Sequence, residues 1–154
     1  MTKRKTRIDS ATEQVRVMAA AAREIVPPSN VPLESGDLPF FASVIAEFAR
    51  SEWSAHQLEL AAMLARTMAD LCREQKALRD EGSVVTTDKG TPVVNPRKAV
   101  VQMHASTILS FRRSLALHAR AQGGDARDIA KRRAGAKSVE DNNPLDDELL
   151  ARPH

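Results

Sequence analysis

Apolar residues spaced three and four apart predict two long helices in the middle of the chain. In the first helix, from Ser54 to about Glu81, the repeating positions are Ala61, Leu64, Met68, Leu71, Gln75 and Leu78. In the second, which follows Asn95-Pro96, they are Val101, His104, Ile108, Phe111 and Leu115. This spacing places side chains in one stripe along a helix, where they pack against a partner. Two stripes of similar length joined by a short connector predict an antiparallel helical hairpin.

The connector between these helices has the pattern of a short β-ribbon. Gly82 ends the first helix, and residues 83–87 and 91–94 are two apolar strands around a polar turn. The valines that need cover from water are Val84, Val85, Val93 and Val94. An isolated two-stranded ribbon is marginal in water, so we expect ribbons of neighbouring subunits to cover one another. The alternative is that the ribbon lies on its own helices.

Both long helices begin with recognisable cap residues. Ser54 followed by Gln57 predicts a capping box, and Trp53 is placed to pack onto Leu58 as a hydrophobic staple. Asn95-Pro96 predicts the start of the second helix, with the asparagine as cap and the proline in the first position, where its missing N–H costs nothing.

Two shorter helices are predicted before Ser54. The first begins at Ser10 or Thr12 and ends at about residue 25, because the two prolines that follow cannot continue it. Residues 27–36 contain prolines and serines and form a linker. The second helix is capped by Asp37 and continues to about Arg50.

The second short helix and the first long helix together have the pattern of a DNA-binding unit. About four residues separate Arg50 from the start of the long helix, and helix, short turn and helix is the local arrangement of a helix-turn-helix. Corners between two helices that bind nothing share this arrangement. DNA binding is therefore one hypothesis here and a purely structural corner is the other.

After Leu117 the apolar pattern ends and tail elements are expected. Gly123-Gly124 interrupts the chain, and Asp125 is placed to cap a short basic helix that extends to Lys137. Residues 145–150 then combine leucines with acidic side chains. This last segment is either a motif that folds against a partner or a solvated terminus.

The chain is expected to form one mainly helical unit with extensions, because 154 residues is the usual size of one domain. Its predicted parts are a basic N-terminal arm, helix and linker (1–36), a helix-turn-helix-like unit (37–66), an oligomerisation core made of the helical hairpin and ribbon (54–118), and a flexible C-terminal tail, basic and then acidic (119–154).

Charge is concentrated in the two ends of the chain. Residues 1–30 carry six basic and three acidic side chains, and residues 119–139 carry six and two. Residues 31–118 carry ten of each, and residues 140–154 carry one basic and five acidic. Basic arms favour polyanions such as nucleic acid, and an acidic tail more often contacts a protein.

The sequence offers no recognisable catalytic or cofactor-binding pattern. It contains no nucleophile elbow, phosphate-binding glycine loop, HExxH motif or pair of cysteines. The single cysteine, Cys72, lies inside a predicted helix, and we expect a small buried side chain there. His104 lies on an apolar stripe, where a packed histidine is expected rather than a metal ligand. We expect a protein that is not an enzyme and that binds neither metal nor cofactor.

No membrane association is expected. No apolar stretch approaches the roughly 20 residues that span a bilayer, and the N-terminus lacks the apolar block of a secretory signal. An intracellular, soluble protein is the expectation.

From Gly82-Ser83-Val84-Val85 to Lys89-Gly90-Thr91-Pro92-Val93-Val94-Asn95-Pro96, after the helix that begins near Trp53, the chain resembles the small terminase subunits of tailed bacteriophages of the cohesive-end type. In that family a long helix, a "G-x-V" strand, a polar turn with glycine, an "N-P" helix start and a second long helix recur in this order. The resemblance covers about residues 50–118. It departs after the second helix, where the family ending "LGL-T/S-P-x-x-R" is replaced by residues 115–120, LALHAR.

This resemblance implies a ring-forming, non-enzymatic subunit that recognises double-stranded DNA. It would bind the site where packaging starts and deliver that DNA to the large terminase subunit, which carries the ATPase and nuclease. Such a protein acts in the host cytoplasm and is absent from the mature virion. Residues 119–150 would dock the large subunit or add basic contacts to DNA. The DNA-reading unit would extend from Leu38 to about Arg66.

The resemblance also assigns roles to individual residues. On the leading edge of the first long helix, DNA would be read by Ser54, His56 and Gln57. Phosphates would be contacted by Lys3, Arg4, Lys5, Arg7, Arg16, Arg23 and Arg50. Subunits would associate through the hairpin and ribbon, at Leu64, Met68, Leu71, Val84, Val85, Val93, Val94, Ile108 and Phe111. Two alternatives remain open: a structural assembly or scaffold protein without specific DNA binding, and a small monomeric helix-turn-helix regulator.

Overall fold

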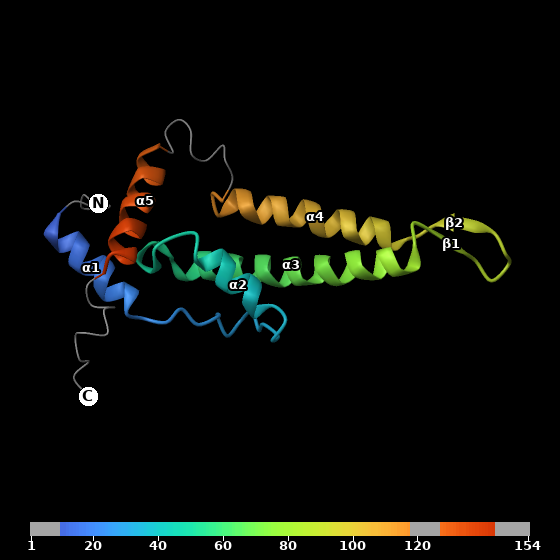
Figure 1. Ribbon diagram of the computed structural model, residues 1–154, viewed down its shortest axis with the longest axis horizontal. Helices are drawn as coiled ribbons and strands as arrows, with labels where there is room; N and C mark the ends of the chain where they lie inside the picture. The colour runs from blue at the N-terminus through green and yellow to red at the C-terminus, as the bar shows by residue number, and fades with distance from the viewer. Residues whose placement is uncertain (1–9, 118–126, 144–154) are drawn as a thin grey trace.

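The computed structural model describes residues 10–117 and 127–143, and within them the chain is mainly helical (Figure 1). In chain order the elements are α1 (Ala11–Ala21), α2 (Leu38–Ile45), the 3-10 turn η1 (Arg50–Glu52), α3 (Ala55–Glu81), β1 (Val84–Thr86), β2 (Pro92–Val94), α4 (Arg97–Ser114) and α5 (Arg127–Asp141). The predicted fold class is confirmed: a long antiparallel helical hairpin carries a short β-ribbon at one end.

The long helix α3 begins and ends where its cap residues predict. The Oγ atom of Ser54 accepts a hydrogen bond from the backbone N–H of Gln57 at 3.3 Å, and the backbone N–H of Ser54 donates to Oε1 of Gln57 at 2.9 Å. This reciprocal pair satisfies two donors that the first turn of a helix leaves free. At the other end Gly82 has φ +86°, a left-handed conformation that favours glycine and stops the helix.

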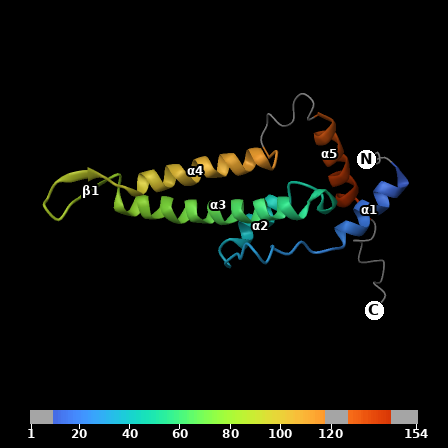
Figure 2. The same cartoon turned by 180° about the vertical axis from the view of Figure 1, so that it is seen from behind.

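The β-ribbon projects beyond the end of the hairpin, away from the other helices (Figures 1 and 2). Its strands are antiparallel, with Val84 opposite Val94 and Val85 opposite Val93. Val84 is 59% exposed and Val94 is 65% exposed, so the ribbon does not bury these valines on its own helices. Residues 10–117 and 127–143 of the same chain therefore leave these two side chains open to water.

A polar tie joins the two long helices at the base of the ribbon. Asn95 is buried, and its Nδ2 donates to Oε2 of Glu81 at 2.9 Å and to the carbonyl of Gly82 at 3.0 Å. Its Oδ1 accepts from the backbone N–H of Arg97 at 2.9 Å. Helix α4 starts at Arg97, one residue later than predicted, with Pro96 at the N-cap position. The side chain of Asn95 nevertheless accepts from the backbone N–H of the first helical residue, which is the contact expected of a cap.

The main core lies where α3 is enclosed between α2 on one side and α4 on the other. Ala61, Ala62 and Ala65 of α3 are fully buried, and these small residues let both neighbouring helices approach closely. The larger buried members of the core are Phe41, Val44, Leu64, Ile108 and Leu115. The predicted apolar stripes thus form the core of a single chain.

Helix α2 is shorter than predicted. It ends at Ile45 rather than near Arg50, and residues 46–54, which include η1, connect it to α3. The indole Nε1 of Trp53 donates to the carbonyl of Ile45 at 3.1 Å and so binds the last turn of α2. The carboxylate of Asp37 accepts from the backbone N–H of Glu34 at 2.9 Å instead of capping the helix. The predicted four-residue turn is therefore wrong, because this connection is longer and partly helical.

Helix α1 also ends early, at Ala21 instead of near residue 25. The guanidinium of Arg50 donates to the carbonyl of Ala21 and, at 3.1 Å, to that of Arg23. These carbonyls are at and just after the helix end, where a helix leaves acceptors unsatisfied. A contact from another part of the chain thus fixes the end of α1.

Helix α5 packs on α1 and η1 to form a second, smaller unit, which we call the terminal module (Figures 1 and 2). Its apolar centre consists of Val17, Ala49 and Ala136, all fully buried, with Val139 packed against them. The basic helix predicted to end at Lys137 continues to Asp141. The predicted cap Asp125 and residues 145–150 lie outside the described residues.

Candidate nucleic-acid interface

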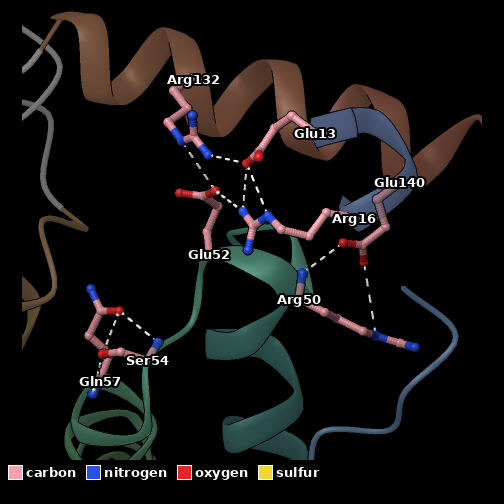
Figure 3. A network of polar contacts seen from close by, with 8 residues as sticks. All are labelled: Glu13, Arg16, Arg50, Glu52, Ser54, Gln57, Arg132 and Glu140. Atoms are coloured by element: carbon pink, nitrogen blue, oxygen red, sulfur yellow. Dashed lines mark hydrogen bonds and ion pairs between the residues drawn. The ribbon is translucent and has the colours of Figure 1, made fainter. Parts of the chain in front are cut away.

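Three residues predicted to read DNA lie at the first turn of α3, and two of them hold that turn together. The side chains of Ser54 and Gln57 are hydrogen-bonded within the capping box (Figure 3). His56, by contrast, is exposed over 78% of its side chain, with Nδ1 3.5 Å from Oε2 of Glu59. Of the three, His56 is the exposed residue whose side chain takes no part in the capping box.

Arg16, a predicted phosphate contact, belongs to an internal ion-pair cluster (Figure 3). Its guanidinium lies 2.7 Å from Oε1 of Glu13 and 3.6 Å from Oε1 of Glu52. The hydrogen bond from Arg16 lowers the pKa of Glu13 despite the opposing effect of burial, and the hydrogen bond from Arg132 lowers it further. Arg16 therefore stabilises the terminal module.

Arg50, another predicted phosphate contact, also has an internal role. Its backbone N–H donates to Oε2 of Glu140 at 2.7 Å, and its Nε lies 3.9 Å from the other oxygen of that carboxylate. The same guanidinium donates to the carbonyls at the end of α1. Arg50 thus joins α1, η1 and α5, while Arg23 itself is exposed on the chain that leaves α1.

The sequence did not identify two cations of α5 that help to build this end of the molecule. Arg132 pairs with Glu13, and its Nε lies 3.4 Å from Oε1 of Glu52. Arg133 lies over the ring of Phe48, 3.9 Å from its centre, and burial lowers the pKa of this guanidinium. Only the basic run at residues 131–133 marks these positions, because their partners lie far away in the sequence.

The remaining predicted phosphate contacts, Lys3, Arg4, Lys5 and Arg7, lie outside the described residues. They precede Ser10, the residue that caps α1 by accepting a hydrogen bond from the backbone N–H of Glu13. The chain before this cap therefore enters at the terminal module.

Exposed cations also lie near this end of the hairpin. Arg112 and Arg113 are exposed in the last turn of α4, which ends beside the start of α3 (Figures 1 and 2). Lys131 is exposed on α5. Among the ion pairs within residues 10–117 and 127–143, none includes these three side chains.

The residues predicted for oligomerisation divide into two groups. Leu64 and Ile108 are buried in the protomer's own core, and Met68, Leu71 and Phe111 are partly buried against it. On the ribbon, Val84, Val93 and Val94 are exposed and Val85 is half-buried. On α3 and α4, further exposed apolar residues that the sequence did not single out are Met63, Val100, Met103 and Leu109.

A groove of about 550 Å³ lies between the linker, α3 and α4. Its walls include Val31, Met63, Met103, His104 and Phe111. His104 is half-buried there, as expected for a packed histidine.

Cys72 is exposed, so the prediction of a buried side chain is wrong. The preceding residue, Leu71, is the one that packs against the core. The described residues contain no group of three or more His, Cys, Asp or Glu side chains that could hold a metal ion. Within the described part of the chain, no helix is both long and apolar enough to cross a bilayer.

Comparisons with known proteins identify the family. The model of the Hendrixvirinae small terminase family matches residues 1–154. A curated relative named "Terminase, small subunit", from Enterobacteria phage HK97, is 30% identical over 159 residues, covering 99% of this chain and 98% of the relative. The predicted resemblance is confirmed, and the chain belongs to the Hendrixvirinae small terminase family.

Proposed function

We propose that this protein is the DNA-recognition subunit of a genome-packaging terminase. It binds the packaging-initiation site in double-stranded DNA and delivers it to the large ATPase and nuclease subunit without catalysing a reaction itself. It does so in the host cytoplasm and does not remain in the mature virion. Family membership supports the terminase role, and the distribution of charge along the protomer supports the DNA-binding part.

The observation that carries DNA binding is that exposed cations of the described residues lie toward one end of a long protomer, the end at which Ser10 follows the basic arm in the sequence. The basic arm 1–7 enters at Ser10, and exposed Arg23 and Lys131 belong to the same end. Arg112 and Arg113 end α4 near the start of α3, where His56 extends into solvent. Clustered cations attract a phosphate backbone and release its counterions on binding. This end, opposite the β-ribbon, is the proposed DNA-binding end.

The proposed contacts are of two kinds. Lys3, Arg4, Lys5, Arg7, Arg23 and His56 are assigned to direct contact with DNA. Arg16, Arg50, Ser54 and Gln57 act indirectly, because their hydrogen bonds and ion pairs hold the turn before α3. Their side chains remain partly exposed, and Arg16 keeps 48% of its accessible surface, so phosphate contact adds to this role.

Self-association is assigned to the hairpin and ribbon (54–118), in a ring. The exposed valines of the ribbon are the strongest support, since ribbons from adjacent protomers would cover them. Leu64 and Ile108 contribute indirectly, by holding the hairpin straight inside each protomer. A ring would present many weak DNA contacts together and convert them into avidity.

For the other parts of the chain we propose the boundaries predicted from the sequence. They are the arm, helix and linker (1–36), the DNA-reading unit (37–66) and the C-terminal segment (119–154). Docking of the large subunit is assigned to residues 119–150. Because α5 packs on α1, part of that segment also serves the fold of the DNA-binding end.

Native mass spectrometry of the full chain, with and without the packaging-site duplex, tests this proposal. A multiple of the protomer mass that gains one duplex supports it, and a scrambled duplex of equal length should bind less. An oligomer whose mass changes with neither duplex would favour the alternative of a scaffold protein without specific DNA binding. A monomer at micromolar concentration would contradict the ring.

A further inference from the structure

Helices α1 and α5 are joined through a charged cluster in which both carboxylates and one of the two arginines have little contact with solvent. Glu13 of α1 is 5% exposed, and the side chains of Glu52 and Arg132 are 5% and 17% exposed. Arg132 of α5 pairs with both carboxylates, and Arg16 of α1 pairs with both as well (Figure 3). Two acids and two arginines therefore form one alternating group across three elements.

This arrangement makes the docking of α1 depend on α5. If α5 leaves, Glu13 and Glu52 lose one of their two arginines. Of these arginines, the two carboxylates then share only Arg16, so the ion pairs that hold α1 against η1 are weakened. At the same time Val17 and Ala49, both fully buried, lose their cover from Ala136.

The dependence is mutual. Helix α5 is among the most polar of the described helices, and from residue 129 onward its one fully buried residue is Ala136, which packs on α1 and η1. Its acidic end is held by η1, where Glu140 accepts from the backbone N–H of Arg50. Arg50 also binds the carbonyls that end α1, so this one residue links the end of α1 to the acidic end of α5.

We propose that α1 and α5 form a clasp that opens as one event and couples the two tails of the protein. The chain enters the clasp at Ser10, directly after the basic arm, and leaves it at Asn143, directly before the acidic segment. A protein partner that binds the acidic segment and draws α5 away therefore releases α1 and changes the position of the arm. By linkage, DNA held by the arm changes the affinity for that partner by the same factor. The use of the clasp to control DNA rests on the proposed function, while the coupling itself is a property of the fold.

Hydrogen–deuterium exchange of the full chain tests the coupling through two variants on opposite sides of the clasp. Arg132→Met, made on α5, should raise amide exchange in α1, and Glu13→Gln, made on α1, should raise it in α5. Each increase should be on the order of tenfold or more, because both changes leave buried charge uncompensated. Exchange in the α3–α4 hairpin should stay unchanged. Lys131→Met is the matched control, since it removes the neighbouring but exposed cation of α5.

A one-sided result, in which each variant loosens only its own helix, would overturn the clasp. An equal rise in the hairpin would also overturn it, because the cluster would then stabilise the whole fold. If Arg132→Met does not fold, Arg132→Lys decides, since it keeps the charge but loses the planar fork and should loosen both helices to a smaller extent.

Adding a DNA duplex separates this proposal from the proposed function. If DNA binds and slows exchange in α5 of the wild type but not of Glu13→Gln, the clasp transmits the signal. If DNA binds and α5 is unaffected, control of the arm is wrong. If DNA does not bind at all, the proposed function fails. The coupling of α1 and α5 is then still decided by the exchange of the two variants without DNA.

Discussion

Asn95 donates a hydrogen bond from Nδ2 to Oε2 of Glu81 at 2.9 Å, and so ties the last residue of α3 to the segment that leads into the return helix. The same carboxylate pairs with Arg97, which lowers the pKa of Glu81, and the hydrogen bond from Asn95 lowers it further. Arg97 also pairs with Glu74, which lies earlier on α3. The hairpin is therefore closed at its ribbon end by polar contacts and at its other end by apolar packing.

Replacing Asn95 with alanine should destabilise this closure. The substitution removes the cap of α4 and two hydrogen bonds of a buried side chain, so the free energy of unfolding should fall by about 1–3 kcal/mol. Urea unfolding at a fixed protomer concentration measures it. Gln102→Ala, an exposed change within α4, is the control and should alter stability by less than about 0.5 kcal/mol. Equal effects of the two changes would show that the tie contributes nothing.

Gly82→Ala should cost stability through backbone conformation. Gly82 has φ +86°, where a side chain is strained by about 1–2 kcal/mol. Space is not the cause, since an added Cβ would lie 3.7 Å from the carbonyl oxygen of Val84. Gly36→Ala is the matched control, because a Cβ there meets nothing within 4 Å, and it should be neutral or slightly stabilising. Thermal unfolding of both variants distinguishes conformational strain from reduced flexibility of the unfolded chain.

The exposed valines of the ribbon should contribute to self-association. Replacing Val84 and Val94 with serine removes apolar area worth about 1 kcal/mol or more per side chain, which weakens a contact between protomers on the order of tenfold or more. Mass measured during dilution should show earlier dissociation, with unchanged helical circular dichroism. Val15→Ser on α1 is the control, since Val15 is 65% exposed, as Val94 is. Unchanged dissociation in the ribbon variant would remove the ribbon from the interface.

Removing the basic arm's charge should weaken DNA binding without altering assembly. With Lys3, Arg4, Lys5 and Arg7 all changed to alanine, affinity should fall, and its dependence on the logarithm of salt concentration should decrease by about 0.9 for each phosphate that the arm no longer neutralises. Fluorescence anisotropy across salt concentrations measures both quantities. A control removes four exposed cations near the ribbon end, Lys76, Arg79, Lys89 and Lys98. If the arm variant and the control bind DNA equally weakly, the affinity depends on the net charge of the protein and not on the location of the cations in the arm.

Local signals explain which parts of the fold the sequence could predict. Ser54 with Gln57, Gly82 and the valines of the ribbon act on neighbours within a few residues, and these elements lie where they were expected. The exposure of Cys72 follows from the same kind of signal, because position 72 lies one residue off the apolar stripe of α3.

Contacts between segments that lie far apart in the sequence explain which features of the fold could not be predicted. Arg50 ends α1 by reaching back 29 residues, and Trp53 binds the end of α2 from outside that helix. Arg132 and Glu13 are 119 residues apart, so no periodicity links them. For the same reason the family resemblance, which assigns Arg16 and Arg50 to phosphates, gives no sign of the internal carboxylate partners that the structure adds.

Acidification should weaken the docking of α1 because of Glu13. The hydrogen bond from Arg16 holds the pKa of this carboxyl below its ordinary value of 4.5 in the folded chain. The unfolded chain therefore binds more protons at acid pH, and stability rises with pH in that range. The contribution of Glu13 is fully present above about pH 5 and is lost as pH falls from 4.5 through the lower, folded pKa. Glu13→Gln lacks this titration, so the difference in unfolding free energy between wild type and variant should be larger at neutral pH than at a pH about one unit below the ordinary pKa. A difference that stays constant between these two pH values would mean that the charge on Glu13 does not stabilise the terminal module.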